Sequence, residues 1–367
     1  LEAVVVGNPI MHHLFLDIDP SELGGAPFAL AVSTATTRRA EGTLAALPPA
    51  ARIHTLPCIA GHVGADAAAV ALSERPYRAK QTTLLVDIGT NAEIILGYRE
   101  RVLAASSPTG PAFEGAEISC GQRAAPGAIE RVRIDRETYA PRFKVIGVDA
   151  WSDDPEFAKL TKKTPVTGIC GSGIVEAIAE LYLAGLLTED GVIPPPPERA
   201  EPHFARVGRT WSYVLHRGKV EVSVSQKDVR AVQLAKAALY AGARLLMDHL
   251  GVDEIHRIRM AGAFGSYIDP KYAMVLGLIP DCDLKHVRAV GNAASTGARM
   301  ALLNRKYRRE IQTQVKKLTK VETATEPRFQ EHFVDAMALP HKTAKFPRLR
   351  AQVELPANAP KQRKRRR

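Results

Sequence analysis

A short polar turn, Asp87-Ile88-Gly89-Thr90-Asn91, separates two apolar segments and holds the residue types that phosphate chemistry needs. Glycine lacks the Cβ that would block a close approach, and the threonine hydroxyl and the turn amides can donate hydrogen bonds. A carboxylate at a strand end, here Asp87, can hold Mg²⁺ directly or through water, or orient an attacking water. The alternative is a plain hairpin turn in which Asp87 and Thr90 satisfy only local backbone groups.

A second candidate turn, Gly262-Ala263-Phe264-Gly265, follows an apolar segment that begins at Ile258. Its two glycines would let the backbone approach a purine ring or its ribose closely. The same turn could instead be a strand-to-helix junction that needs small residues for packing. This turn alone does not decide between the two roles.

A glycine-rich segment, residues 168–173, leads into an amphipathic stretch that predicts a helix. Gly171 and Ser172 would stand at the start of that helix, where backbone amides can bind an anion. A tight turn without a ligand is the other interpretation. Cys170 has no histidine nearby in the sequence to activate it, so we expect a small buried side chain and not a nucleophile.

The four cysteines are far apart and form no Cys-x-x-Cys pair, so their spacing predicts neither a zinc site nor an iron–sulfur cluster. No segment approaches the roughly 20 apolar residues of a membrane helix, and no secretory signal is recognisable. The expected location is therefore the cytoplasm.

Most of the net charge of +11 lies in residues 341–367, with ten Lys or Arg and one acid. This predicts a flexible basic tail, which could touch nucleic acid or anionic lipid but is expected to be merely solvated.

Strands and helices alternate along the chain, which predicts an α/β fold with a mixed sheet. A long helix is expected from about Gln226 to Leu250, with Ser225 as its N-cap and Asp228 at the acid position of a capping box. Residues 131–165 mix charge, proline and aromatic residues and give no clear assignment. Four prolines at 194–197 predict a surface excursion that reaches about residue 218.

The order of these motifs is similar to that of the actin-like ATPases, in which two ribonuclease-H-like halves face each other across a nucleotide cleft. By this resemblance Asp87 to Asn91 is the second phosphate motif and Gly262 to Gly265 the adenosine motif, while residues 60–72 and 291–302 are the connecting helices. The resemblance implies an actin-like, ribonuclease-H-like fold with a mixed sheet, whose first subdomain is incomplete here. It also implies ATP and Mg²⁺ as ligands.

Longer motifs narrow the resemblance because their order and spacing recur together. They are GNPIMHHL (7–14), GPAFEGAEISCGQRA (110–124), GICGSG (168–173), AKAALYAG (235–242), AGAFGSYID (261–269) and VGNAASTGARMAL (290–302). Over about residues 2–340 the chain resembles the carboxy-terminal part of the reductive activators of corrinoid-dependent methyltransferases. These are ferredoxin-like proteins with an actin-like (ASKHA) ATPase domain.

In that family an amino-terminal 2Fe–2S domain delivers an electron to cob(II)alamin, and ATP drives its reduction to cob(I)alamin. The iron–sulfur cysteines and the first phosphate hairpin precede the GNPIM motif in the family and do not occur in this sequence. The chain also begins with Leu1, inside an expected strand. We therefore expect a fragment that neither carries the electron nor binds ATP with full affinity.

The resemblance implies ATP-dependent activation of a corrinoid protein as function, that protein as partner, and a homodimer. It assigns the catalytic role and a Mg²⁺ ligand to Asp87. Nucleotide contacts fall to Gly89, Thr90, Asn91, Gly171, Ser172, Gly262, Ala263, Phe264 and Gly265. The alternatives are a phosphotransferase of the acetate or sugar kinase type, and a non-catalytic docking or dimerisation module.

Four regions are expected along the chain. Residues 1–78 would be the remainder of the first ribonuclease-H-like subdomain, and residues 79–304 the second, with an insertion near 190–218. Residues 305–345 would form a C-terminal helical segment, and residues 346–367 the basic tail.

Overall fold

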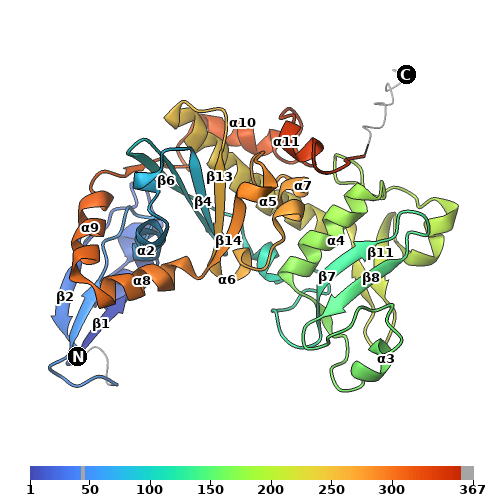
Figure 1. Ribbon diagram of the computed structural model, residues 1–367, viewed down its shortest axis with the longest axis horizontal. Helices are drawn as coiled ribbons and strands as arrows, with labels where there is room; N and C mark the ends of the chain where they lie inside the picture. Colours follow the sequence, from blue (N-terminus) through green and yellow to red (C-terminus); the bar gives the residue numbers. More distant parts are fainter. Residues whose placement is uncertain (43–45, 357–367) are drawn as a thin grey trace. The chain divides into compact units, whose positions relative to one another are not determined.

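The computed structural model describes residues 1–42 and 46–356, and the chain divides into two compact units that are described separately (Figure 1). The first unit contains residues 1–111, 237–270 and 279–334, and the second contains residues 112–236, 271–278 and the segment from Asp335 onward. No helix within the described ranges is long and apolar enough to cross a membrane.

The centre of the first unit is a six-stranded mixed sheet in the order β14-β13-β4-β5-β6-β15. β4, β5 and β6 form an antiparallel meander, whereas β13 runs parallel to both β4 and β14. Every residue of β4 except Asp87 is buried, as in a strand that is covered on both faces. The predicted α/β fold with a mixed sheet is confirmed. The strands are β4 (Thr83–Ile88), β5 (Ala92–Tyr98), β6 (Arg101–Ser107), β13 (Arg257–Ala261), β14 (Val287–Gly291) and β15 (Thr319–Lys320).

A three-stranded sheet in the order β1-β3-β2 opens the chain and also belongs to the first unit. Helix α2 packs against α8 so closely that a Cβ added to Gly297 would lie 2.0 Å from the carbonyl oxygen of Ala69. The alanine-rich sequence of α2 permits this approach, because its small side chains keep the two helices near each other. The elements are β1 (Glu2–Val5), β2 (Thr36–Arg39), β3 (Arg52–Thr55), α1 (Pro9–Phe15), α2 (Ala65–Glu74), α8 (Ala293–Leu303), α9 (Arg305–Val315) and α10 (Pro327–Asp335).

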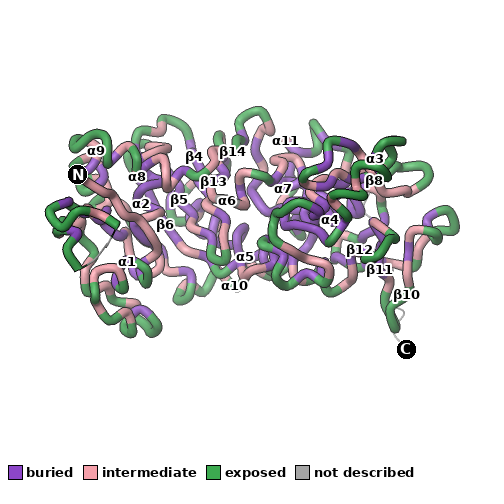
Figure 2. The backbone as a smooth tube through the Cα atoms, turned by 90° about the horizontal axis from the view of Figure 1, so that it is seen from below, coloured by how far each residue is buried: buried purple, intermediate pink, exposed green. Residues whose placement is uncertain are grey.

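The second unit is built around α4, all of whose residues are buried (Figure 2). One sheet of this unit, β8-β7-β9, contains two strands that the sequence left unassigned, and the other, β10-β11-β12, contains the excursion after the four prolines. The elements are β7 (Ala128–Ile134), β8 (Pro141–Val145), β9 (Gly168–Ile169), β10 (Phe204–Val207), β11 (Thr210–His216), β12 (Val222–Val224), α3 (Phe157–Leu160), α4 (Gly171–Leu183), α7 (Pro270–Leu276) and α11 (Pro347–Arg350).

Helix α5 (Gln226–Leu250) has the predicted bounds and the predicted capping box. The Ser225 amide donates to an Asp228 carboxylate oxygen at 2.8 Å, and the Asp228 amide donates to the Ser225 hydroxyl at 3.3 Å. These two bonds satisfy backbone donors that the start of a helix would otherwise leave unpaired.

Residues 346–353 are folded, which differs from the tail expected from residue 346 onward. Phe346 and Leu349 are buried, and the short helix α11 joins them. Their apolar side chains anchor a segment whose charge alone suggested a solvated chain. The end of the expected tail, residues 357–367, lies outside the described residues.

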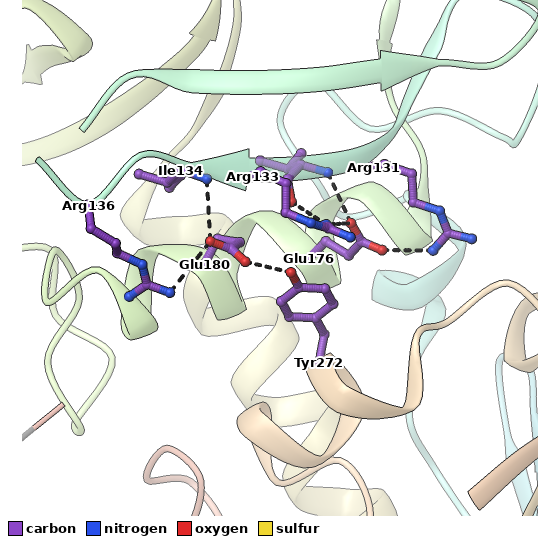
Figure 3. A network of polar contacts seen from close by, with 8 residues as sticks. Arg131, Arg133, Ile134, Arg136, Glu176, Glu180 and Tyr272 are labelled. Carbon is purple, nitrogen blue, oxygen red and sulfur yellow. Dashed lines mark hydrogen bonds and ion pairs between the residues drawn. The ribbon is translucent and has the colours of Figure 1, made fainter. Parts of the chain in front are cut away.

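Two buried glutamates of α4 meet the arginines of β7 (Figure 3). Glu176 accepts hydrogen bonds from Arg131 at 2.7 Å, from Arg133 at 2.5 Å, and from the backbone amide between these two residues at 3.0 Å. Glu180 accepts from the Tyr272 hydroxyl at 2.5 Å. The sequence of β7 therefore alternates charge for a structural reason, because its arginines compensate carboxylates buried beneath them.

Candidate active site

The two turns that the sequence singled out lie side by side at one edge of the six-stranded sheet. β13 pairs in parallel with β4, and Ala261 is the register partner of Asp87, so both strands end at the same place. Gly262 follows at once with φ +91°, and a Cβ there would lie 2.5 Å from an Asp87 carboxylate oxygen and 2.8 Å from the Ile88 carbonyl oxygen. Only glycine fits this position without a shift of its neighbours.

The hairpin turn of Gly89, Thr90 and Asn91 is held from behind by a buried threonine. The Thr109 hydroxyl lies 2.9 Å from the Gly89 carbonyl oxygen and 3.0 Å from that of Thr90. The Gly89 amide donates to the Asn91 carbonyl oxygen at 3.1 Å. Thr90 and Asn91 are exposed at the tip. The turn therefore has a fixed backbone and an accessible polar end.

Two further carboxyl groups lie near Asp87. Neither was among the site residues predicted from the sequence. Glu93 on β5 is the register partner of Asp87 in the hairpin, and Asp66 lies in the first turn of α2. None of the three has a basic partner among the described residues. The sequence did point to Glu93, because it is the one charged residue of the apolar strand β5 and lies opposite Asp87 in the hairpin. Asp66 is remote in sequence, so no spacing rule could connect it.

The protonation of this acid cluster, Asp66, Asp87 and Glu93, is set mainly by burial. Burial raises the pKa of Asp87 to about 6, and the charge of Asp66 adds to the rise. Burial, followed by the charges of Asp66 and Asp87, raises the pKa of Glu93 well above its ordinary value. Burial also raises the pKa of Asp66. Three half-buried carboxyls without a basic partner among the described residues form a place where a cation would be stabilised.

The start of α2 is shaped by close backbone contacts. The Ala65 and Asp66 amides both donate to the Gly7 carbonyl oxygen, at 3.0 and 3.3 Å. A Cβ on Gly64 would lie 2.6 Å from an Asp66 carboxylate oxygen and 2.6 Å from that same carbonyl. The GNPIM segment thus fixes the first turn of α2, and with it the position of Asp66.

The remaining predicted site residues are divided between the two units. Gly265 and Phe264 lie in the short helix α6 (Gly262–Gly265), beside Asp87 in the first unit, as does the backbone of Ala263, whose side chain lies outside the described part. Gly171 and Ser172 begin α4 in the second unit, and both are buried. The structure therefore brings together the predicted phosphate and adenosine turns, while the glycine-rich segment belongs to a different unit.

A magnesium ion is implied by the actin-like fold, and the acid cluster fits it in one respect. Within the described ranges no three acidic, histidine or cysteine side chains are arranged to hold a metal by themselves. Mg²⁺ usually keeps several waters and takes only one or two protein carboxylates together with substrate phosphates. Asp87, a half-buried carboxylate without a basic partner among the described residues, suits that mode of binding.

Comparisons with known proteins show which family the chain resembles. Residues 81–350 match the family described as the C-terminal domain of RACo, the ASKHA domain, and residues 1–78 match the RACo middle region. The corrinoid activation enzyme RamQ of Eubacterium limosum is 36% identical over 345 residues, which are 91% of this chain and 55% of that protein. A Co(II) methylated amine-specific corrinoid protein reductase of Methanosarcina barkeri is 29% identical over 272 residues, 72% of this chain and 46% of that protein.

A solved structure extends the match to three dimensions. The reductive activator for corrinoid, iron-sulfur protein superposes with a TM-score of 0.80 and 32% identity, covering 93% of this chain and 53% of that chain. The chain thus spans about half the length of the relatives it matches. It belongs to the RACo family, with the middle region in residues 1–78 and the ASKHA, or actin-like ATPase, domain in residues 81–350.

Proposed function

We propose that the chain is the ATP-binding and partner-docking part of a protein that reductively activates corrinoid proteins, from cob(II)alamin to cob(I)alamin. The names of its relatives, a corrinoid activation enzyme and a corrinoid protein reductase, support this assignment. The electron would come from a 2Fe–2S domain elsewhere in the longer protein. A corrinoid protein is the proposed partner, a homodimer the proposed assembly, and the cytoplasm the proposed location.

The observation that carries the proposal is the convergence of Asp87 and Gly262 at one sheet edge, beside Asp66 and Glu93. Asp87 would bind Mg²⁺, directly or through water, or orient the attacking water. Gly89, Thr90 and Asn91 would contact phosphates, because their turn is rigid and its tip is exposed. Bound Mg²⁺ would neutralise phosphate charge and thereby assist departure of the terminal phosphoryl group.

The adenosine end of the nucleotide is proposed to meet Gly262, Ala263, Phe264 and Gly265. Gly262 lies directly beside Asp87, and its lack of a side chain permits the close packing of the two turns. Gly171 and Ser172 are proposed as further nucleotide contacts. ATP would act by binding one conformation of the parent protein more tightly than another, since only unequal affinity shifts a conformational equilibrium.

The test uses the longer protein together with its corrinoid partner. Asp87→Ala should abolish ATP turnover and the ATP-dependent appearance of the cob(I)alamin spectrum while leaving the fold intact by circular dichroism. Glu137→Ala, at an exposed position of the second unit, is the matched control and should change neither. Unchanged turnover in Asp87→Ala would refute the role of this residue. Release of ADP that depends on a small metabolite instead of the corrinoid protein would favour the phosphotransferase alternative.

A further inference from the structure

A pocket of about 320 Å³ in the first unit is lined by residues of β1, β2, β3 and α9. Its wall is strongly basic, with four arginines and a histidine against one glutamate. These residues, called the arginine pocket, are Glu2, Arg52, His54, Arg305, Arg308 and Arg309. The arginine pocket shares no residue with the acid cluster.

One arginine of the pocket is fixed in place by the glutamate. Glu2 accepts hydrogen bonds from Arg308 at 2.6 Å and from Arg305 at 2.9 Å, and these bonds, with Arg308 foremost, lower the pKa of Glu2 to about 2. The Arg308 side chain is only 10% exposed, and its Nε donates to the Ala301 carbonyl oxygen at 2.7 Å. Glu2 therefore remains ionised and balances one of the four arginine charges.

Two of the excess charges belong to Arg52 and Arg309. Both are exposed at the pocket, and neither has an acidic partner within the part of the chain that the structure describes. Four arginines against one carboxylate leave three positive charges around a small volume. Guanidinium groups bind phosphate through paired, planar hydrogen bonds, so a cluster of this kind favours a multiply charged oxyanion.

The other polar groups of the pocket are neutral and bond mainly to one another. The Thr37 hydroxyl bonds His54 Nδ1 at 2.7 Å, and the Thr36 and Thr55 hydroxyls lie 2.8 Å apart. Burial, followed by the charge of Arg308, lowers the pKa of His54, so its ring is neutral at pH 7. Its Nε2 is buried without a hydrogen-bond partner among the described residues. Phenylalanine, tyrosine and tryptophan are not among the lining residues, so stacking on a nucleotide base has no platform there.

We propose that the arginine pocket binds the phosphate group of a phosphate monoester, at a site separate from the acid cluster. The dianionic charge of a phosphate monoester suits the excess of arginines, two of which, Arg52 and Arg309, have no acidic partner among the described residues. The pocket volume suits a small ligand and not a whole nucleotide held by its base. This second anion site does not depend on the proposed ATP chemistry.

Calorimetric titration of the chain with inorganic phosphate at constant ionic strength tests the proposal. Arg52→Ala and Arg309→Ala should each weaken phosphate binding by about tenfold, because each removes a guanidinium without an acidic partner. Arg206→Ala, which removes an exposed arginine of the second unit, should leave binding unchanged. Equal weakening by Arg206→Ala would show that phosphate is bound only by general charge attraction, and it would overturn the proposal. Undiminished binding in the double variant Arg52→Ala/Arg309→Ala would overturn it too.

A second experiment distinguishes a soluble phosphate ester from a lipid headgroup as the ligand of the arginine pocket. The chain is sedimented with phosphatidylcholine vesicles that contain or lack phosphatidic acid. Binding of inorganic phosphate without co-sedimentation assigns the pocket to a soluble phosphate ester. Co-sedimentation that is lost in the double variant assigns it to a lipid headgroup. Binding of an acidic peptide without any binding of phosphate would overturn the proposal.

Discussion

Asp87 occupies a position that no carboxylate would adopt for stability alone. Its charge is partly buried, two more carboxyls lie within electrostatic reach, and no described basic residue compensates it. Burying an unpaired charge costs free energy, which a protein tolerates mainly where function requires it. A cation bound at the acid cluster would therefore offset this cost.

The pH dependence of stability tests this burial. Because the pKa of Asp87 is raised from 3.8 to about 6, folding favours its protonated form. The stability that this residue contributes is complete below about pH 4 and is lost as the pH rises through about 6. Asp87→Asn should therefore be about 2 to 3 kcal/mol more stable than the unchanged chain at pH 7 and nearly equal to it at pH 4. Urea unfolding at the two pH values measures the difference; an identical difference at both would contradict the assigned burial.

Gly262 offers a sharper test of geometry, with a matched control. Both Gly262 and Gly208 have positive φ, but only at Gly262 would a Cβ meet other atoms, namely Asp87 and Ile88. Gly208→Ala should cost about 1 kcal/mol of stability for its backbone alone. Gly262→Ala should cost about 2 to 4 kcal/mol, because its neighbours must also move. It should also weaken Mg-ATP binding by at least about tenfold, whereas Gly208→Ala should not. Equal effects of the two substitutions would contradict the close approach at Gly262.

At the scale of elements, the hairpin β4–β5 and the parallel neighbour β13 decide where the chemistry lies. The apolar runs of β4 and β13 predicted strands, and the polar turns after them predicted the site. The pairing of β4 with β13 follows only from the fold, since Asp87 and its register partner Ala261 lie far apart in the sequence. The local sequence pattern identifies each strand and turn, whereas the pairing of the strands in the fold brings the turns together.

β7 shows why sequence patterns fail where charge is structural. The mixed sequence of residues 131–165 gave no clear assignment, and the arginines of β7 pair with a glutamate that α4 buries. A strand whose charged side chains face the core can be recognised from the sequence only when the residues that pair with those charges are known. The segment from residue 346 was predicted to be a flexible tail for a similar reason. Its many basic residues outweigh two apolar side chains, Phe346 and Leu349, which the structure buries.

Removing one partner of this buried network should be costly. Glu176→Ala leaves the backbone amide of Val132 without its acceptor and leaves two arginines without their carboxylate. We expect a loss of about 2 to 4 kcal/mol, below the full cost of a broken buried pair because the arginines are about a third exposed. Glu137→Ala, at an exposed loop position, should change stability by less than about 0.5 kcal/mol. Chemical denaturation measures both, and a loss no larger than the control's would contradict a stabilising role for the network.

At the scale of the whole molecule, the chain spans about half the length of the relatives that it matches. The sequence predicted the family, the mixed sheet and the two turns, because these depend on local motifs that recur in order. It did not predict the acid cluster, whose three carboxyls come from α2, β4 and β5. The arginine pocket was likewise hidden, since β3 and α9 lie far apart in the chain.

The central claim is that the turns at Asp87 and Gly262 belong to one nucleotide site. With the 27 glycines of the chain labelled by ¹⁵N, amide resonances can be followed during a titration with Mg-ADP. The account predicts that Gly89, Gly262 and Gly265 shift together and saturate with a single dissociation constant, while Gly208 remains unchanged. Shifts confined to other glycines, or different dissociation constants for Gly89 and Gly262, would contradict it.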